Sequence, residues 1–125
     1  MVKSFLGAII VAILLVVGAI YEGGAVRKEF KEFKEEVEEV YTLVDEERAT
    51  EQDMYELQSK WLSKKRRLFV FIPHNEIKEI ELWLTESIKL VREEKWEDAL
   101  SKIEVLKELV AEIPKTFELT FENIL

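Results

Sequence analysis

The sequence has no cysteine, one histidine, two prolines and four glycines among its 125 residues. The absence of cysteine excludes a disulfide framework, thiol chemistry and lipidation of an N-terminal cysteine. The last glycine is Gly24, and the prolines are Pro73 and Pro114, so helix-breaking residues are rare after the N-terminal region. No strand alternation of useful length is present, and we predict an all-α protein.

Chemistry-bearing patterns are also missing. Acidic residues outnumber basic ones by 26 to 18, and the net charge of −8 argues against a nucleic-acid partner. A zinc site normally needs three or four His, Cys or acidic ligands, and His74 stands alone, so we interpret it as a polar turn residue. No glycine-rich phosphate loop and no serine in a nucleophile elbow occurs. We therefore predict no catalytic residue, no metal and no cofactor.

One long apolar run is present near the N-terminus. Residues Phe5 to Tyr21 are seventeen in number and carry no charge. As a helix they would extend roughly 25 Å, near the lower limit for crossing a hydrocarbon core of about 30 Å. We predict that residues 1–22 are a transmembrane anchor, with a signal peptide cleaved after Ala25 as the alternative. Residues 23–25, Gly-Gly-Ala, are expected to form a flexible linker between the anchor and a helical domain at residues 26–125.

The charges that flank this run bear on its orientation. Only Lys3 precedes it, whereas Arg27, Lys28, Lys31 and Lys34 follow it, and the positive-inside rule taken literally keeps those four in the cytoplasm. A very short N-terminal tail is nevertheless difficult to translocate alone. We expect a single-pass protein of the cell membrane with its domain on the extracytoplasmic side.

After the linker the apolar residues recur with helical spacing. The pattern predicts four antiparallel helices in a bundle, the first of which has an a/d seam. This seam serves an internal core or, alternatively, a partner or a homodimer. The seam residues are Val26, Phe30, Phe33, Val37, Val40 and Val44.

The first helix is followed by a polar stretch. Thr50 and Asp53 have the spacing of a capping box, which predicts a turn near residues 48–50. The alternative is a single rod of about 47 residues that continues through the second helix. We expect this second helix to run from Glu51 to about Ile72, where Pro73 ends it.

Two further helices are predicted beyond Pro73. Asn75 would cap the third, and the fourth would run from Trp96 to Pro114, with Thr116 capping a last short helix. The expected core faces of the second, third and fourth helices are Met54, Leu57, Trp61, Leu68 and Ile72; Ile77, Ile80, Leu84, Ile88 and Val91; and Trp96, Ala99, Ile103, Leu106, Val110 and Ile113.

An internal similarity links the two halves of the domain. Residues 43–48 read LVDEER and residues 90–95 read LVREEK. Each stretch would end the first helix of an α-hairpin, so two hairpins are predicted. They form either a bundle or a short tetratricopeptide-like array.

Three short motifs carry a family resemblance. They are His74-Asn75-Glu76-Ile77, Trp96-Glu97-Asp98-Ala99-Leu100 and Glu122-Asn123-Ile124-Leu125. With these motifs the chain resembles the domain-of-unknown-function family 4363 over nearly its whole length. The resemblance implies a membrane-associated helical protein of Gram-positive, often spore-forming bacteria, and it implies no catalytic residue.

A basic stretch interrupts the acidic domain. Residues 60–72 contain five lysines and arginines and no acidic residue. If the chain turns near residue 49, the second helix returns this stretch to the bilayer, where cations and aromatic rings suit the headgroup region. We predict a contact surface for a membrane or a partner; the alternative is that the cations pair with glutamates and the rings fill the core. The predicted contact residues are Lys64, Lys65, Arg66, Arg67, Phe69, Phe71, Phe117 and Phe121.

These patterns together predict a non-enzymatic, membrane-anchored accessory protein. Its helical domain would bind another membrane or envelope protein, or the bilayer surface. One alternative is a secreted helical binding module released by signal cleavage. Another is a small-ligand carrier or enzyme that uses the interior of the bundle.

Overall fold

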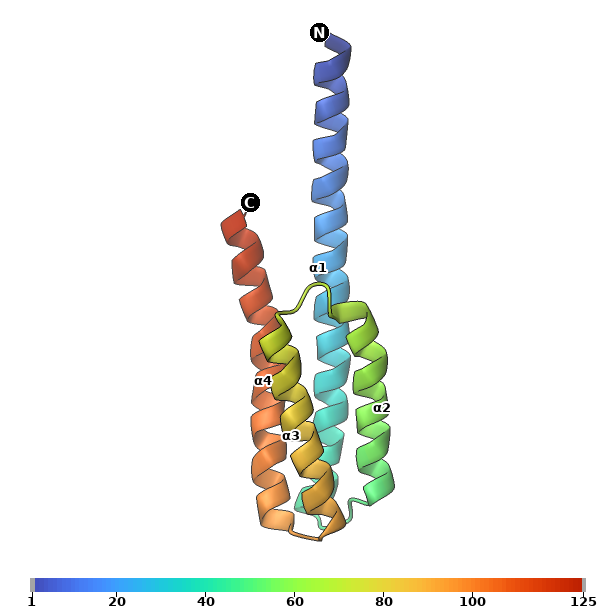
Figure 1. The fold of residues 1–125 in the computed structure, drawn as a ribbon, viewed down its shortest axis with the longest axis vertical. Coiled ribbons are helices and arrows are strands. Elements are labelled where there is room, and N and C mark those ends of the chain that lie inside the picture. The colour runs from blue at the N-terminus through green and yellow to red at the C-terminus, as the bar shows by residue number, and fades with distance from the viewer. Residues whose placement is uncertain (1, 125) are drawn as a thin grey trace.

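The computed structural model describes the backbone of residues 2–124 and the side chains of residues 3–18, 20 and 24–115. The helices of this region are α1 (Val2–Asp45), α2 (Glu51–Leu68), α3 (His74–Arg92) and α4 (Trp96–Ile124), and the described backbone contains no strand. Successive helices run antiparallel and form a bundle (Figure 1). The predicted all-α class is confirmed.

The first and last helices close the bundle. α1 packs along α4, and α4 packs along α3, over extensive interfaces, whereas α2 lies less extensively against α1 and α3. The direct interface between the first and the last helix closes the four helices into a bundle around one core. The two predicted α-hairpins are α1–α2 and α3–α4.

α1 is much longer than the bundle. It contains 44 residues, and its N-terminal half projects beyond the other helices (Figure 1). The predicted flexible linker at residues 23–25 is instead helical, because a glycine costs a helix only about 1 kcal/mol and helix-forming residues flank the pair. The span predicted at residues 1–22 finds no support here, since no helix among the described residues is both long and apolar enough to cross a membrane.

A capping box separates α1 from α2, as predicted. The backbone N–H of Asp53 donates to Thr50 Oγ1 at 3.1 Å, and the N–H of Thr50 donates to Asp53 Oδ2 at 2.8 Å. These bonds satisfy two N–H groups at the start of α2. The alternative of one uninterrupted rod is therefore wrong.

The internal similarity marks two equivalent helix ends. Glu47 and Glu94 both adopt the left-handed conformation, with φ of 56° and 54°. The N–H of the next residue bonds five residues back in both turns, from Arg48 to Leu43 at 2.8 Å and from Lys95 to Leu90 at 2.9 Å. This is the bonding of a Schellman motif, so the repeated sequence forms the same turn twice.

Three predicted boundaries differ from the structure. α2 ends at Leu68, four residues before Ile72, and α3 begins at His74 with Pro73 as its N-cap in place of Asn75. α4 continues past Pro114 to Ile124, so the predicted last short helix is its C-terminal part. A proline removes one backbone donor and bends a helix without always ending it, and this part of α4 leans away from α1 (Figure 1).

The core consists of the predicted helix faces. Every residue of the α1 seam is at most 7% exposed, so this seam faces the interior of its own bundle. Phe33 of α1 stacks on Trp61 of α2 with ring centroids 5.4 Å apart. All predicted core residues of α2 and α3 are buried, and on α4 only Trp96 is partly exposed.

Candidate functional site

The basic stretch lies at the end of the bundle from which α1 projects. The connection between α2 and α3, residues 69–73, is at this end, which we call the basic end (Figure 1). The turns at the opposite end carry the acidic residues Asp45, Glu46 and Glu47 and the pair Glu93 and Glu94. The acidic protein therefore gathers cations close to its projecting apolar helix.

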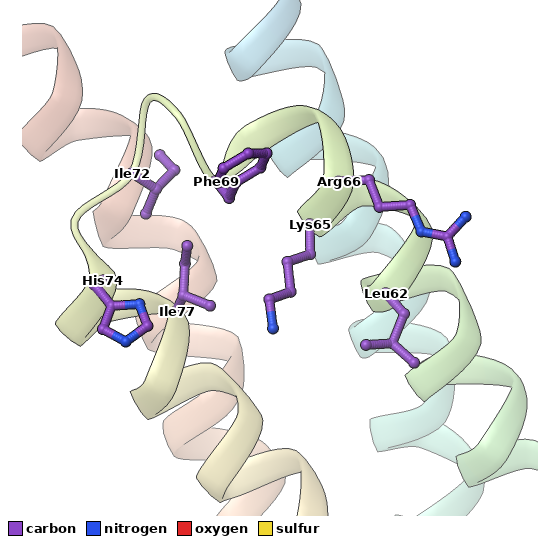
Figure 2. A pocket seen from close by; sticks show the side chains of 7 residues that line it. All are labelled: Leu62, Lys65, Arg66, Phe69, Ile72, His74 and Ile77. Carbon is purple, nitrogen blue, oxygen red and sulfur yellow. The ribbon is translucent and has the colours of Figure 1, made fainter.

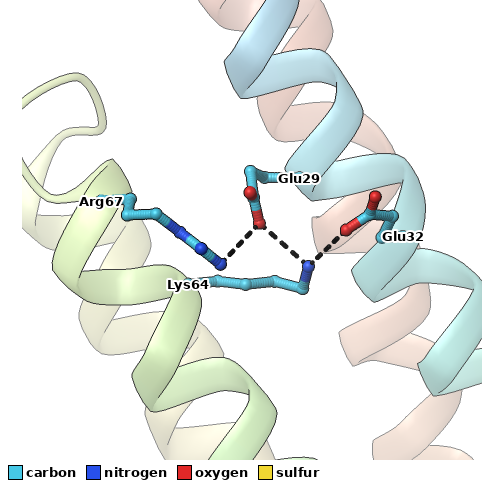
Figure 3. Close-up of polar contacts among 4 residues, drawn as sticks. All are labelled: Glu29, Glu32, Lys64 and Arg67. Atoms are coloured by element: carbon cyan, nitrogen blue, oxygen red, sulfur yellow. Dashed lines mark hydrogen bonds and ion pairs between the residues drawn. The ribbon is translucent and has the colours of Figure 1, made fainter.

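Lys64 is buried between α2 and α1. Its side chain is 7% exposed, and its Nζ donates to Glu29 Oε2 at 3.0 Å and to Glu32 Oε2 at 3.1 Å (Figure 3). Arg67 Nη2 approaches the same Glu29 oxygen at 3.1 Å. Lys64 and Arg67 therefore join α2 to α1. For these two residues the alternative to a membrane or partner contact is confirmed, because their cations pair with glutamates of the same chain.

Lys64 and Glu32 each favour the charged form of the other. Burial lowers the pKa of Lys64, but the hydrogen bonds to Glu29 and Glu32 together with the negative charges of Glu29 and Glu36 outweigh burial and leave its pKa raised. The hydrogen bond from Lys64, followed by its positive charge, holds the pKa of Glu32 below its ordinary value of 4.5. Ionised partners give the bonds between α1 and α2 their strength.

Lys65 and Arg66 have different surroundings. Lys65 Nζ lies 2.5 Å from Glu81 Oε1 on α3, and Glu81 also accepts a 3.4 Å bond from Trp61 Nε1. Arg66 is exposed and points away from α3 (Figure 2), without an ion pair to any other side chain that the structure describes. Arg66 therefore presents its guanidinium to the surroundings.

The predicted aromatic contact residues also differ in how exposed they are. Phe69 is 58% exposed and its neighbour Val70 is 71% exposed, whereas Phe71 is half-buried and packs against the core. Phe117 and Phe121 belong to α4, but their side chains lie outside the described residues. The exposed apolar surface of the α2–α3 connection is thus formed by Phe69 and Val70.

A pocket separates α2 from α3 beneath their connection. The two helices diverge toward the basic end and leave a volume of about 510 Å³ between them (Figure 2). The pocket, which we call the α2–α3 pocket, has four apolar and three basic lining residues: Leu62, Phe69, Ile72 and Ile77, and Lys65, Arg66 and His74.

The sequence pattern alone does not predict this pocket. His74, expected from the sequence to be a polar turn residue, is exposed at the start of α3 and lines the pocket. One signal was available on α2, where Leu62, Arg66 and Phe69 are spaced by four and three residues and share a helix face. Which residues of α3 line the pocket depends on how far α2 and α3 diverge. The residue spacing along each helix does not determine this divergence.

A second hollow lies between α1 and α4 near the basic end. Its volume is about 280 Å³, and four of its lining residues are the cations Arg27, Lys31, Lys34 and Lys115. Lys34 pairs with Glu38 at 3.9 Å, and Lys115 pairs with Glu112 at 3.4 Å. Basic side chains therefore line hollows on two sides of the bundle close to the projecting helix.

Comparison with known proteins gives a family and no activity. Residues 23–124 match the family described as Domain of unknown function (DUF4363). No curated protein and no solved structure matches the chain. Among the described residues, no group of three His, Cys, Asp or Glu side chains is placed to hold a metal ion.

Proposed function

Because the chain belongs to the DUF4363 family, whose description assigns no activity, we propose its function from its own geometry. The protein is a membrane-tethered helical module that acts by contact with the membrane surface and with proteins there, without catalysing a reaction. The N-terminal half of α1 lies in the bilayer, and the basic end of the bundle rests on the headgroups. The observation that carries this proposal is the exposure of apolar side chains on all sides of α1 between Phe5 and Ile20.

All-round exposure favours lipid as the covering material. A coiled-coil partner covers one stripe of a helix, whereas a helix that is apolar on every side is a membrane span or the centre of a large core. A second copy of the chain would leave the outer side of each helix uncovered. The large apolar side chains in question are each 41–69% exposed: Phe5, Leu6, Ile9, Ile10, Val11, Ile13, Leu14, Leu15, Val16, Val17 and Ile20.

The free energy of inserting the N-terminal half of α1 into the bilayer can be estimated from its apolar residues. On the scale of helix insertion, each Leu, Ile, Phe or Val near the centre of a span contributes about −0.3 to −0.6 kcal/mol. Eleven such residues contribute at most roughly −3 to −7 kcal/mol in total, because those near the ends of the run contribute less than those at its centre. This gain favours placing the helix in the bilayer, and two charges near its centre would cancel it.

The charge distribution of the bundle supports the same arrangement. A lysine or arginine near an anionic membrane surface contributes about 1 kcal/mol. Arg66 and the cations of the α1–α4 hollow lie near the basic end, while the turns with Glu47 and Glu94 lie at the far end. Phe69 and Val70 are exposed where the bundle would meet the interface. Attraction at one end and repulsion at the other would hold the bundle upright.

Vesicle flotation of the full-length chain tests the proposal. The wild type is expected to float with phospholipid vesicles and to resist alkaline extraction. Ile10→Asp combined with Leu14→Asp is expected to remain in the bottom fraction, because two aspartates cost about 5–7 kcal/mol near the centre of a span.

A matched control places the same charges on the bundle. Ser59→Asp combined with Leu82→Asp changes two exposed residues and is expected to float like the wild type. The proposal fails if the wild type does not float, or if both double variants float equally well.

The extracytoplasmic placement of the bundle is part of this proposal. The chain has no cysteine, so Ser59→Cys on the exposed face of α2 would provide a single labelling site. A maleimide that cannot cross membranes is expected to label intact cells. Labelling only after lysis would place the bundle on the cytoplasmic side.

A further inference from the structure

We infer that the outer face of α2 and the adjoining α2–α3 pocket bind an amphipathic helix of another protein, with acidic residues beside its apolar face. The inference deepens the proposed contact with proteins by naming the surface and the chemistry of the partner. It rests on the proposed function only in expecting the partner at the same membrane. The observation that carries it is an exposed apolar stripe along α2, next to a partly apolar cavity and an outward-pointing arginine.

The apolar stripe has the spacing of a helix–helix contact. Tyr55, Leu62 and Phe69 follow each other at seven residues, a step of nearly two turns that returns to the same side of α2. Phe69 is the C-cap residue and keeps helical backbone angles, so it continues the stripe. The three side chains are 41%, 47% and 58% exposed, so the bundle leaves this face uncovered. A second helix that lies along α2 would cover all three.

The α2–α3 pocket adjoins this stripe and provides a place for an anchoring side chain. Leu62 and Phe69 belong to both, and Ile72 and Ile77 continue the apolar lining of the pocket (Figure 2). Its volume of about 510 Å³ lies within the range of about 300–1,000 Å³ found for small-molecule sites, so it is large enough for a bulky side chain. Helices bind grooves through apolar residues at every third or fourth position, and the strongest contacts are large side chains in pockets. A helix on the stripe would insert such a side chain between α2 and α3.

Two cations beside the pocket favour a partner with acidic residues. Arg66 follows Leu62 by four residues on the same face, points away from α3 (Figure 2) and makes no ion pair with another described side chain. Lys78, in the second turn of α3, is exposed and likewise has no ion pair with a side chain that the structure describes. Lys65, by contrast, is already paired with Glu81. A carboxylate of the partner would pair with Arg66 through two parallel hydrogen bonds, whereas a partner cation there would be repelled.

Two other occupants fit this face less well. By the helical rise, Tyr55 lies about 21 Å from Phe69 along α2, away from the basic end. A membrane surface across the basic end would therefore cover Phe69 and leave Leu62 and Tyr55 exposed. A second copy in the same membrane would lay its α2 parallel to the first and bring Arg66 toward Arg66, and such contacts between like charges are unfavourable. A helix of a different protein with acidic residues covers the whole stripe without this repulsion.

Photo-cross-linking of the full-length chain, in the cells that naturally produce it, tests the inference. Benzoylphenylalanine in place of Ser59 lies three residues before Leu62 and seven before Arg66, so it reports on the face without altering either. The same group in place of Ser101, which is exposed on α4, is the matched control. The Ser59 variant is expected to form one discrete protein adduct that the Ser101 variant does not form. Mass spectrometry is expected to map the link to a helical segment with apolar residues at every third or fourth position and an excess of aspartate and glutamate.

Three substitutions combined with the label at position 59 assign the adduct to this surface. Leu62→Gln removes apolar contact from the middle of the stripe and is expected to lower the adduct yield at least about tenfold. Arg66→Glu is expected to have an effect of the same size, because it places a negative charge against the acidic residues of the partner. Lys115→Glu makes the same change of charge at the basic end, but on α4, and is expected to leave the yield unchanged. All three positions are exposed, and circular dichroism checks that each variant keeps its helical fold.

The outcomes separate this inference from the bilayer anchor. A chain that floats with vesicles but forms no protein adduct at position 59 overturns the inference alone. An adduct with a phospholipid, with a second copy of the chain or with a mainly basic segment also overturns it, as do equal yields from Arg66→Glu and Lys115→Glu. A chain that fails to float but forms the expected adduct supports this surface and removes only the anchor.

Discussion

Lys64 Nζ lies 3.0 Å from Glu29 Oε2, inside the interface between α2 and α1. The Lys64 side chain is 7% exposed and that of Glu29 is 19% exposed, so both charges have lost much of their hydration. Such a pair contributes little net stability compared with apolar residues, but breaking it leaves a buried charge uncompensated. The pair therefore restricts where α2 can lie along α1.

Replacement of one partner is expected to be costly. Lys64→Met should lower the free energy of unfolding by about 2 kcal/mol, less than the loss for a fully buried pair because Arg67 still approaches Glu29. Urea denaturation of the full-length chain in a non-ionic detergent measures this change. Adding Glu29→Met should recover most of the loss; a double variant no more stable than the single one would attribute the loss to packing.

Acid should weaken the same interface through Glu32. Its pKa is lower in the folded protein than its ordinary value of 4.5, because Lys64 donates a hydrogen bond to it and attracts it. Ionised Glu32 therefore stabilises the fold above pH 4.5, and this contribution is lost as the pH falls through the lowered folded pKa. Glu32→Gln should be less stable than wild type at neutral pH and lose less stability on acidification. Parallel pH curves for Glu32→Gln and wild type would contradict this; the exposed Glu35→Gln is the control.

The two left-handed turn residues predict a stabilising substitution. Glu47 and Glu94 have φ of 56° and 54°, a conformation that costs an L-residue about 1–2 kcal/mol and glycine almost nothing. Glu47→Gly and Glu94→Gly should each raise the free energy of unfolding by about 0.5–1 kcal/mol, after the greater flexibility of unfolded glycine is deducted. Glu46→Gly, one residue before the left-handed position, should be destabilising, and a similar gain from it would refute the explanation.

The capping box at the start of α2 predicts that removing its threonine hydroxyl lowers the stability of the fold. Thr50→Ala should lower the free energy of unfolding by about 1 kcal/mol, because the N–H of Asp53 loses its acceptor. Thermal unfolding followed by circular dichroism gives the measurement. Thr42→Ala removes a hydroxyl that donates to Glu38 O within α1 at 3.1 Å, and it should change the stability much less. Equal losses in the two variants would mean that the cap contributes nothing specific.

The core could be predicted from the sequence because helix periodicity fixes which side chains share a face. Phe30, Phe33 and Val37 follow each other at three and four residues, and all are buried. Helix boundaries were less predictable, since continuation through Gly24 or Pro114 depends on the residues on both sides of the breaker. The local sequence shows how much a glycine or proline destabilises a helix. It does not show how much the neighbouring helical turns and their packing stabilise it.

The basic stretch shows why the site was only partly predictable. Its location at the end near the projecting helix follows from the turn at Thr50. The roles of single cations do not follow, because successive residues rotate by about 100° around a helix. Lys64 and Arg66 therefore lie on nearly opposite sides of α2, one paired with α1 and the other exposed. Only the positions of the neighbouring helices distinguish the buried lysine from the available arginine.

The absence of a break in α1 has a mechanical consequence. Its residues Val26 and Phe30 are anchored in the core, and the same helix continues without interruption toward Phe5. If that N-terminal part sits in a bilayer, a change in membrane thickness that tilts it must swing the whole bundle as a rigid lever. The acidic turns at the distal tip would then travel farthest, so the protein would convert bilayer thickness into lateral displacement of its outermost charges.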